Sequence, residues 1–256
     1  EDIGILIVDT PRAYYSHSTV LELMNAGATV VVCGANHLPV TVMHPIEGNT
    51  VQTERIRSQI ESSVPLRKQL WKQIVRAKIT MQRENLMWLA DRAKDEATEQ
   101  SIIAAEDISA TAKRMSSLIS KIKSGDPTNI EGQASRVYWT SFFGSDFRRD
   151  REGDAPNNLL NYGYAIMRAS VARAVVGAGL HPSIGLFHKN RYNAFCLADD
   201  LMEPLRPIVD RTVRQIAESG EYDVNKNTKK ALLEMLTLEV ETYKQKGPLM
   251  VALEKM

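Results

Sequence analysis

The 256-residue sequence is poor in cysteine and contains no long apolar run. Cys33 and Cys196 lie far apart, with no metal-ligand spacing around either of them. This pattern excludes a disulfide framework and a zinc knuckle, and it favours a reducing cytoplasm. No apolar run approaches the 18 residues of a membrane-spanning helix and no signal peptide is evident, so we expect no membrane partner.

Several catalytic signatures are also missing. The sequence has no Gly-Lys-Ser/Thr phosphate loop and no Gly-x-Ser-x-Gly nucleophile elbow. It has no Gly-x-Gly-x-x-Gly fingerprint either, which argues against a nucleotide-binding α/β fragment at its N-terminal end. The net charge of +1 does not predict a nucleic-acid partner, so the charge has to be examined locally.

The first fifty residues show the pattern of a small sheet. Apolar or β-branched runs predict strands over 5–8, 29–33 and 39–43, and a helix over 18–26 ends at Gly27. The sequence begins with Glu1 almost directly on an apolar run, so we expect the natural protein to start earlier and this sheet to be incomplete. The C-terminus also looks short.

The composition changes near Val51, after which helical periodicity dominates. One predicted helix has an apolar stripe made of Leu66, Leu70, Ile74, Ala77 and Met81. Its opposite face is basic and holds Arg67, Lys68, Lys72, Arg76 and Lys78. Further helices are predicted over 82–98, 105–123, 129–143, 158–178, 192–218 and 227–245. The fold class is therefore α+β: a partial β-containing domain over 1–50, followed by a large all-α domain over 51–256.

Glu131, His188 and Glu203 are the candidate metal ligands. Two carboxylates and one imidazole suit Mg²⁺ or Mn²⁺, and such an ion can activate an oxygen nucleophile and stabilise a phosphoryl transition state. Glu131 has a competing explanation, since Thr128 and Glu131 have the spacing of a helix capping box. His188 follows apolar residues, where a histidine is more often a hydrogen-bonded core residue than a ligand.

Three acids follow His188 on the predicted 192–218 helix. Glu203 is three or four residues from Asp200 and Asp199, so all three acids are expected on one face, where a cation would offset their repulsion. A solvated acidic face, or an ion pair between Glu203 and Arg206, is the alternative.

Three motifs, in order along the chain, resemble those of one family. EGQASRVYW resembles the glutamate motif of the CRISPR-associated spacer integrase, NNLLNYGYAIMRA its asparagine–tyrosine helix, and GLHPSIGLFHKNRYNAFCLADDLMEPLRP its histidine-to-acid signature. The form is that seen with RNA-guided single-protein effectors, and the resemblance runs from about Gly4 to about Glu239.

This resemblance implies a set of site residues. The family's catalytic metal ligands map onto Glu131, His188 and Glu203, and Asp200 matches an auxiliary acid one helical turn earlier. Asp199 has no assigned role.

Basic and polar residues near these ligands are candidates to contact DNA. The basic residues are Arg148, Arg149, Arg151, Lys189 and Arg191, and the 67–78 helix face is a weaker candidate. Such contacts to phosphates would be salt-dependent and largely independent of sequence. Possible site-lining residues are Asn158, Asn161, Tyr162 and Tyr164, although the two tyrosines fit a core equally well.

The resemblance also implies an activity and its partners. The family is a divalent-metal-dependent DNA endonuclease and integrase of CRISPR adaptation. It joins the 3′-OH ends of a spacer (prespacer) duplex to a repeat array by direct transesterification, with Mg²⁺ or Mn²⁺. It works as a homodimer bridged by a small ferredoxin-like companion, in some systems with the RNA-guided effector nuclease. The alternative is a non-enzymatic helical scaffold that binds DNA or a partner helix, in which the acids only form ion pairs.

Overall fold

The computed structural model describes residues 3–35, 39–47, 49–242 and 245–253. Its N-terminal sheet contains three strands, β1 (Ile5–Val8), β2 (Thr29–Cys33) and β3 (Pro39–Met43). Helix α1 (His17–Asn25) connects β1 to β2, which pair in parallel, and β3 pairs antiparallel with β2 on its other side. The three predicted strands and the intervening helix are therefore confirmed.

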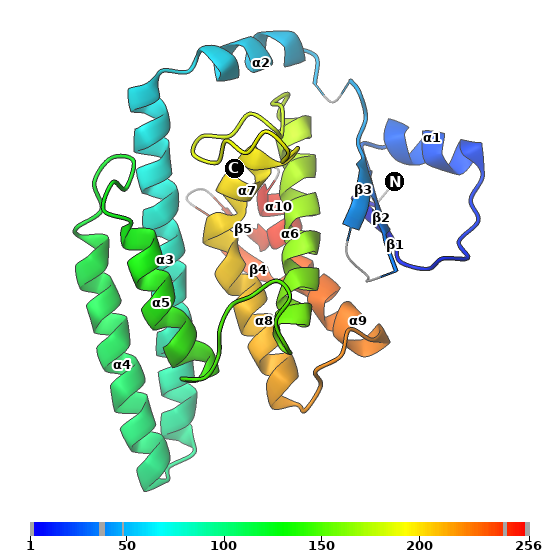
Figure 1. The fold of residues 1–256 in the computed structure, drawn as a ribbon. Coiled ribbons are helices and arrows are strands. Elements are labelled where there is room, and N and C mark those ends of the chain that lie inside the picture. Colours follow the sequence, from blue (N-terminus) through cyan, green and yellow to red (C-terminus); the bar gives the residue numbers. More distant parts are fainter. Residues whose placement is uncertain (1–2, 36–38, 48, 243–244, 254–256) are drawn as a thin grey trace.

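The rest of the chain is mostly helical (Figure 1). Its longer helices are α2 (Gln52–Glu61), α3 (Val64–Asp95), α4 (Glu99–Ile119), α5 (Ile130–Phe143), α6 (Asn157–Gly177) and α8 (Arg206–Glu218). The shorter elements are α7 (Cys196–Met202), η1 (Glu203–Leu205), α9 (Lys226–Glu234), η2 (Met235–Thr237) and α10 (Leu249–Leu253). No helix among the described residues is long and apolar enough to cross a membrane.

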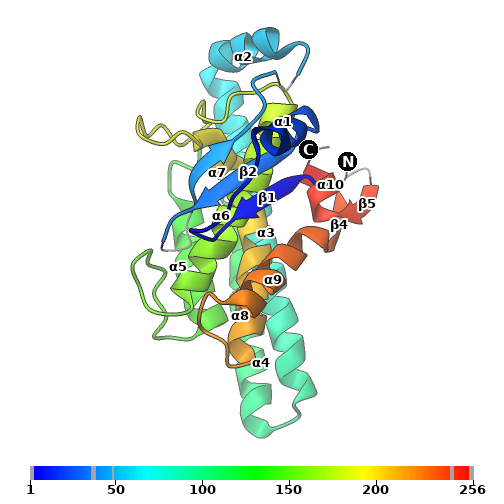
Figure 2. The same ribbon diagram turned by 90° about the vertical axis from the view of Figure 1, so that its right-hand side faces the viewer.

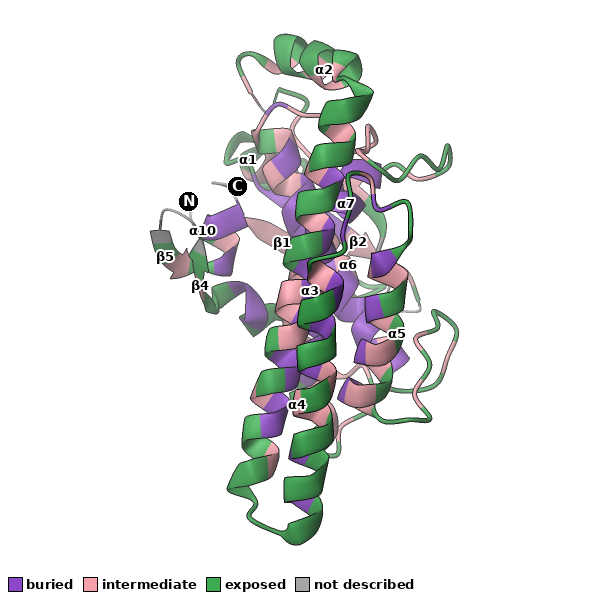
Figure 3. Cartoon of the chain, turned by 90° about the vertical axis from the view of Figure 1, so that its left-hand side faces the viewer, coloured by how far each residue is buried: buried purple, intermediate pink, exposed green. Residues whose placement is uncertain are grey.

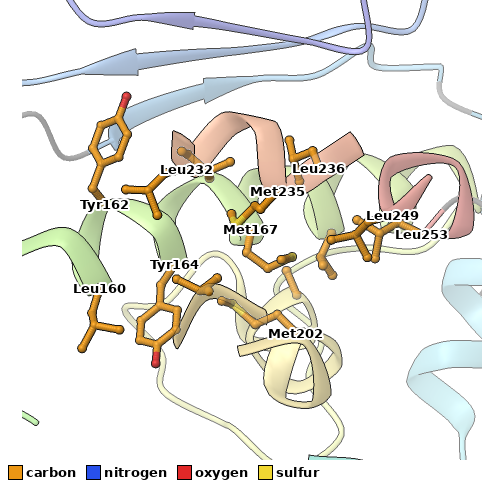
Figure 4. Packing of buried hydrophobic residues seen from close by; sticks show 14 of the residues in the cluster. Leu160, Tyr162, Tyr164, Met167, Met202, Leu232, Met235, Leu236, Leu249 and Leu253 are labelled. Carbon is orange, nitrogen blue, oxygen red and sulfur yellow. The ribbon is translucent and has the colours of Figure 1, made fainter. Parts of the chain in front are cut away.

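Helix α6 is the centre of the larger core. Its buried side chains pack against those of α7, α8, α9 and α10, as Figure 4 shows around Met167 and Leu232. The sheet lies against another side of the same helix (Figure 2). There Arg173 Nε donates to the Gly27 carbonyl at 3.0 Å. Helix α6 therefore connects the sheet to the helical part of the protein.

A second core lies between α3, α4 and α5. Helices α3 and α4 form a long antiparallel hairpin whose outer faces are exposed (Figure 3). We predicted two helices across this stretch, but α3 is one helix of 32 residues. Pro65 lies in its first turn, where proline is tolerated, and no Gly or Pro interrupts it afterwards.

The predicted apolar face of α3 is only partly correct, because Ile74 packs against the core but the buried residues form a different stripe. The buried residues include Trp71, Val75, Ile79 and Leu86, whereas Leu66 of the predicted stripe is 46% exposed. Lys78, assigned from the sequence to the basic face, is buried. Both sets of residues recur at helical spacing, so periodicity alone could not choose between them.

The C-terminal region corrects a further prediction. We expected a helix over 227–245, but α9 ends at Glu234 and a hairpin of β4 (Glu239–Thr242) and β5 (Gln245–Pro248) follows η2. The region after residue 50 is therefore not entirely helical. The division into domains at residue 50 stays a prediction.

Gly163 lies where α6 packs closely against α8 and α9. A Cβ there would lie 2.5 Å from Val209 Cγ1 and 3.1 Å from Leu232 Cδ2. Overpacking costs about 1–3 kcal/mol, and Ala returns up to about 1 kcal/mol of helix propensity. We therefore expect Gly163→Ala to lower the free energy of unfolding by about 1–2 kcal/mol in urea titrations.

Gly177 on the same helix is the matched control, because a Cβ there would meet no heavy atom within 4 Å. Gly177→Ala should leave stability unchanged or raise it slightly. If Gly163→Ala were as stable as Gly177→Ala, α6 would not be packed this closely against α8.

Candidate metal-ion site and arginine cleft

Glu131 lies in the first turn of α5, which is capped by residues other than those we predicted. Asn129 is the N-cap, in a left-handed conformation, and its Oδ1 accepts from Gly132 N at 3.0 Å. The two oxygens of Asp126 accept from Ile130 N and Glu131 N at 2.9 Å each. The predicted capping box of Thr128 and Glu131 is therefore wrong, and the Glu131 carboxylate is available for other contacts.

His188 is positioned by Asp200. Asp200 Oδ2 accepts from Leu186 N at 2.6 Å and Phe187 N at 2.9 Å, and Oδ1 accepts from His188 N at 3.2 Å. Asp200 Oδ1 also lies 2.5 Å from His188 Nδ1, which must donate because a carboxylate only accepts. This hydrogen bond raises the pKa of His188 despite the opposing effect of burial.

That arrangement is typical of a metal-binding histidine. Such a histidine usually donates one ring nitrogen to a carboxylate, which fixes the ring and leaves the other nitrogen for the ion. The imidazole also lies edge-on to Trp71 of α3, at 5.8 Å between ring centroids. Trp71 in turn stacks on Phe187 at 4.3 Å. The ring of His188 is thereby fixed from two sides, and Nε2 is the nitrogen left for a ligand.

Glu203 begins the short 3₁₀ turn η1 and is only 6% exposed. Arg206 Nε donates to its Oε1 at 2.8 Å, as the ion-pair alternative anticipated. Lys78 Nζ lies 2.6 Å from its Oε2. Burial would raise the pKa of Glu203, but Lys78 and Arg206 outweigh it and lower the pKa to about 2. Glu203 is therefore a carboxylate throughout the physiological pH range.

The predicted continuous helix over 192–218 is wrong. Helix α7 starts at Cys196, η1 follows it, and α8 starts at Arg206. Pro204 and Pro207 fall at this junction, and each lacks the N–H that a continuous helix needs.

Each acid of this region has its own partner. Asp199 accepts from Arg168 Nε at 2.6 Å and from Asn193, Asp200 holds His188, and Glu203 faces Lys78 and Arg206. The repulsion that the sequence predicted among three acids on one helix face therefore does not determine how these side chains are arranged.

Lys78 is the residue that the sequence analysis misplaced. Its Nζ lies 2.5 Å from Glu131 Oε1 and 2.6 Å from Glu203 Oε2, so one ammonium joins two of the three predicted ligands. Burial would lower the pKa of Lys78, but Glu203 and Glu131 outweigh it and raise the pKa. The signal that locates Lys78 is its spacing from Trp71 and Val75, which places it on the buried face of α3.

The donor set fits a hard divalent cation, although Lys78 lies between the carboxylates. In the described part of the chain, no three His, Cys, Asp or Glu side chains are close enough to hold an ion together. Glu203 Oε2 is buried, and its neighbour is the Lys78 ammonium at 2.6 Å. An oxygen in this state can serve as a ligand once the ammonium moves.

A cleft of about 570 Å³ opens between β3 and α6, and its lining includes Met202 and Arg206. We call it the arginine cleft, because four of its lining residues are Arg149, Arg151, Arg168 and Arg206. Arg206 belongs to both places, since it pairs with Glu203 and its guanidinium lies 4.6 Å from the centre of the Tyr164 ring. Glu152 also lines the cleft, and Arg168 and Arg206 are paired with Asp199 and Glu203. Through Arg206 the cleft adjoins the candidate metal site.

The cleft separates the predicted DNA-contacting and site-lining residues into two groups. Arg149, Arg151, Asn161 and Tyr164 line it. Arg148, Asn158, Tyr162, Lys189 and Arg191 are not among its lining residues. Arg148 donates to the Ser145 carbonyl, Asn158 donates to the Tyr222 carbonyl, and Tyr162 faces the sheet beside Ile7 and Val31. Lys189 and Arg191 are exposed in the loop after His188.

The floor of the site is a buried polar network. Asp210 of α8 accepts from Tyr164 Oη at 2.5 Å and from Tyr138 Oη at 2.9 Å. Asn85 Nδ2 donates to Tyr138 Oη at 2.9 Å. Burial outweighs these hydrogen bonds and raises the pKa of Asp210 to about 7. This network ties α3, α5, α6 and α8 together beneath Arg206.

Comparison with known proteins identifies a family. The model of the family CRISPR associated protein Cas1 matches residues 4–245. A CRISPR-associated endonuclease Cas1 from Neisseria meningitidis serogroup C is 34% identical over 258 residues, which covers 100% of this chain and 79% of that protein. A second such endonuclease, from Pyrobaculum aerophilum, is 31% identical and covers 88% of this chain and 75% of that protein.

Solved structures share the fold at low sequence identity. A casposase bound to integration product has a TM-score of 0.77 at 20% identity, covering 100% of this chain and 76% of that one. A CAS1 protein from Thermotoga maritima has a TM-score of 0.69 at 16% identity, covering 99% of this chain and 84% of that one. A Cas6-RT-Cas1–Cas2 complex has a TM-score of 0.69 at 18% identity, covering 98% of this chain and 29% of that one.

Proposed function

The chain belongs to the CRISPR associated protein Cas1 family, and we propose from this that it is a divalent-metal-dependent DNA integrase and endonuclease of CRISPR adaptation. Its proposed reaction joins the 3′-OH ends of a spacer duplex to the repeat array by direct transesterification. The observation that carries the proposal is the meeting of Glu131 and Glu203 at one buried cation, beside a histidine held by Asp200.

Glu131, Glu203 and Nε2 of His188 are the groups that would hold Mg²⁺ or Mn²⁺. Such an ion lowers the pKa of an attacking hydroxyl and neutralises charge on the scissile phosphate. Asp200 holds the imidazole by Nδ1 in the tautomer that a ligand needs. Because the ligand must be neutral imidazole, protonation of His188 in acid would weaken ion binding.

The arginine cleft is the proposed path for the DNA backbone towards the ion. Guanidinium groups bind phosphate oxygens in a planar, two-pronged geometry, and four of them line the same opening. Lys189 and Arg191, exposed next to His188, would extend this contact. Binding of this kind follows the phosphates and not the bases, so its affinity should fall steeply with salt concentration.

The proposed partners follow from the relatives. One neighbour in fold is bound to an integration product and another is a complex of Cas1 with Cas2, which supports DNA and a Cas2-type companion as partners. The homodimer, cooperation with an RNA-guided effector nuclease and a cytoplasmic location stay predictions from the sequence.

A strand-transfer assay tests the proposed function. The protein is incubated with a labelled 3′-OH duplex, a repeat-containing target, a Cas2-type companion and Mn²⁺, and half-site product is measured. We expect product with Mn²⁺, none with EDTA, and none from a duplex ending in a 3′-phosphate. Equal product with EDTA, or wild-type activity in Glu131→Ala, His188→Ala and Glu203→Ala, would refute the metal assignment.

The ion pairs in the site favour one alternative, a non-enzymatic scaffold in which these acids only balance Lys78 and Arg206. Calorimetry separates the two functions. If the protein is a scaffold, it should show no Mn²⁺ binding that depends on His188. If it is an integrase, His188→Ala should abolish Mn²⁺ binding.

A further inference from the structure

Lys78 lies between Glu131 and Glu203, the two carboxylates that are proposed to hold the ion. Its Nζ is 2.5 Å from one carboxylate and 2.6 Å from the other, and the residue is 8% exposed. The two acids come from α5 and η1, and the lysine comes from α3. Three separate elements therefore place charged side chains next to one another, and α3 contacts both α5 and η1.

The charges of this group balance without any metal ion. Glu131 and Glu203 supply two negative charges, and Lys78 and Arg206 supply two positive ones. Arg206 lies to one side, bonded to Oε1 of Glu203, whereas Lys78 lies between the two acids. Of these two cations, Lys78 is the one whose position conflicts with an ion bound to both carboxylates.

We propose that Lys78 is a built-in competitor of the divalent cation, which neutralises Glu131 and Glu203 in the metal-free protein and must leave them when the ion binds. This inference rests on the proposed function, because it takes the two acids to be metal ligands. The sequence pattern had placed Lys78 on the basic face of its helix and suggested no role for it in the site.

The chemistry of lysine suits this exchange. An ammonium is a compact charge on a flexible four-carbon stem, so it can leave a pair of carboxylates without displacing the helix that carries it. While it stays, the buried Glu203 and the partly buried Glu131 are paired, which keeps the metal-free site folded. The apparent affinity for the ion is the intrinsic affinity multiplied by the fraction of molecules in which Nζ has left the site.

A purely structural ion pair makes the opposite prediction for metal binding. If Lys78 only held α3, α5 and η1 together, its removal would loosen the ligands and weaken the binding of an ion. If Lys78 competes with the ion, its removal frees both carboxylates and strengthens binding. The sign of the change in Mn²⁺ affinity therefore separates the two roles.

The test compares the wild-type chain with Lys78→Met, which keeps a similar length and removes the charge. Mn²⁺ dissociation constants are measured by calorimetry, and Tm is measured with and without Mn²⁺. We expect Lys78→Met to bind Mn²⁺ at least tenfold more tightly, to melt lower without the ion and to gain more in Tm from it. Lys78→Gln should behave similarly, and it provides a polar replacement if the Met variant folds poorly.

Lys72→Met is the matched control, because Lys72 is an exposed lysine of the same helix. Its Mn²⁺ affinity should equal that of the wild type. An unchanged or weaker Mn²⁺ affinity in both Lys78 variants, with the wild type binding normally, overturns the role of Lys78 and leaves the metal site standing. Absence of Mn²⁺ binding in the wild type and in both variants rejects the metal site, and the competitor role with it.

Discussion

Glu203→Gln is expected to reduce strand transfer by about 10³-fold or more. The substitution keeps the shape of the side chain and removes the charge that would bind the ion. An ion acting as a Lewis acid contributes several kcal/mol to the transition state, and each 1.36 kcal/mol is a factor of ten in rate. The measurement is the initial rate of half-site product formation at saturating Mn²⁺.

The substitution should also lower the free energy of unfolding. This loss of stability has to be separated from the loss in the rate of strand transfer. Glu203 is buried and faces Lys78 and Arg206, and removing one partner of a buried charge group costs about 3–5 kcal/mol. Lys78 keeps Glu131 as a partner, so we expect a loss near the lower end of that range. Rates are therefore compared below the Tm of the variant, with its fold checked by circular dichroism.

Glu218→Gln is the control for Glu203→Gln. Glu218 ends α8 and pairs with Arg214 and Arg92, away from the predicted ligands. It should keep wild-type strand transfer. If Glu203→Gln retained more than a tenth of the wild-type rate while folded, Glu203 would not be a metal ligand.

Asp210→Asn is expected to change how stability depends on pH. Burial raises the pKa of Asp210 to about 7, from an ordinary value of 3.8. A carboxyl whose pKa is raised by folding binds its proton more tightly in the folded state. Its stabilising contribution is therefore complete below the ordinary pKa and is lost as pH rises through about 7.

Asparagine cannot ionise, so the variant lacks this loss. The difference in free energy of unfolding, variant minus wild type, should rise by on the order of 2 kcal/mol between pH 5 and pH 8. Urea titrations at the two pH values measure it. Asp107→Asn, at an exposed position of α4, is the control and should give a difference that does not depend on pH. A constant difference for Asp210→Asn would mean that Asp210 is ionised at both pH values.

Local patterns predicted much of the secondary structure. The strands around Val30 and Thr41 follow from β-branched runs bounded by turn residues, and such runs need no knowledge of distant residues. The helices over 130–143 and 157–177 match their predictions to within one residue at each end. Errors arose where a signal was ambiguous, as at the two prolines that divide α7 from α8.

The motifs also pointed to the candidate acids and histidine, through the family resemblance more than through spacing. Apart from the pairing of Glu203 with Arg206, they did not provide the partner of each side chain. Asp200 and Glu203 are three residues apart, yet one holds His188 and the other faces Lys78. The break after Met202 separates them, so their relation along the sequence does not describe their contacts.

Composition and periodicity over a few turns are enough to predict the early sheet, the location of most helices and the candidate acids, because these are local properties of the chain. The burial of Lys78 between Glu131 and Glu203, which lie 53 and 125 residues further along the chain, depends on the tertiary packing. The reason is that charge pairing depends on distance in space, and burial depends on which face of α3 meets its neighbours.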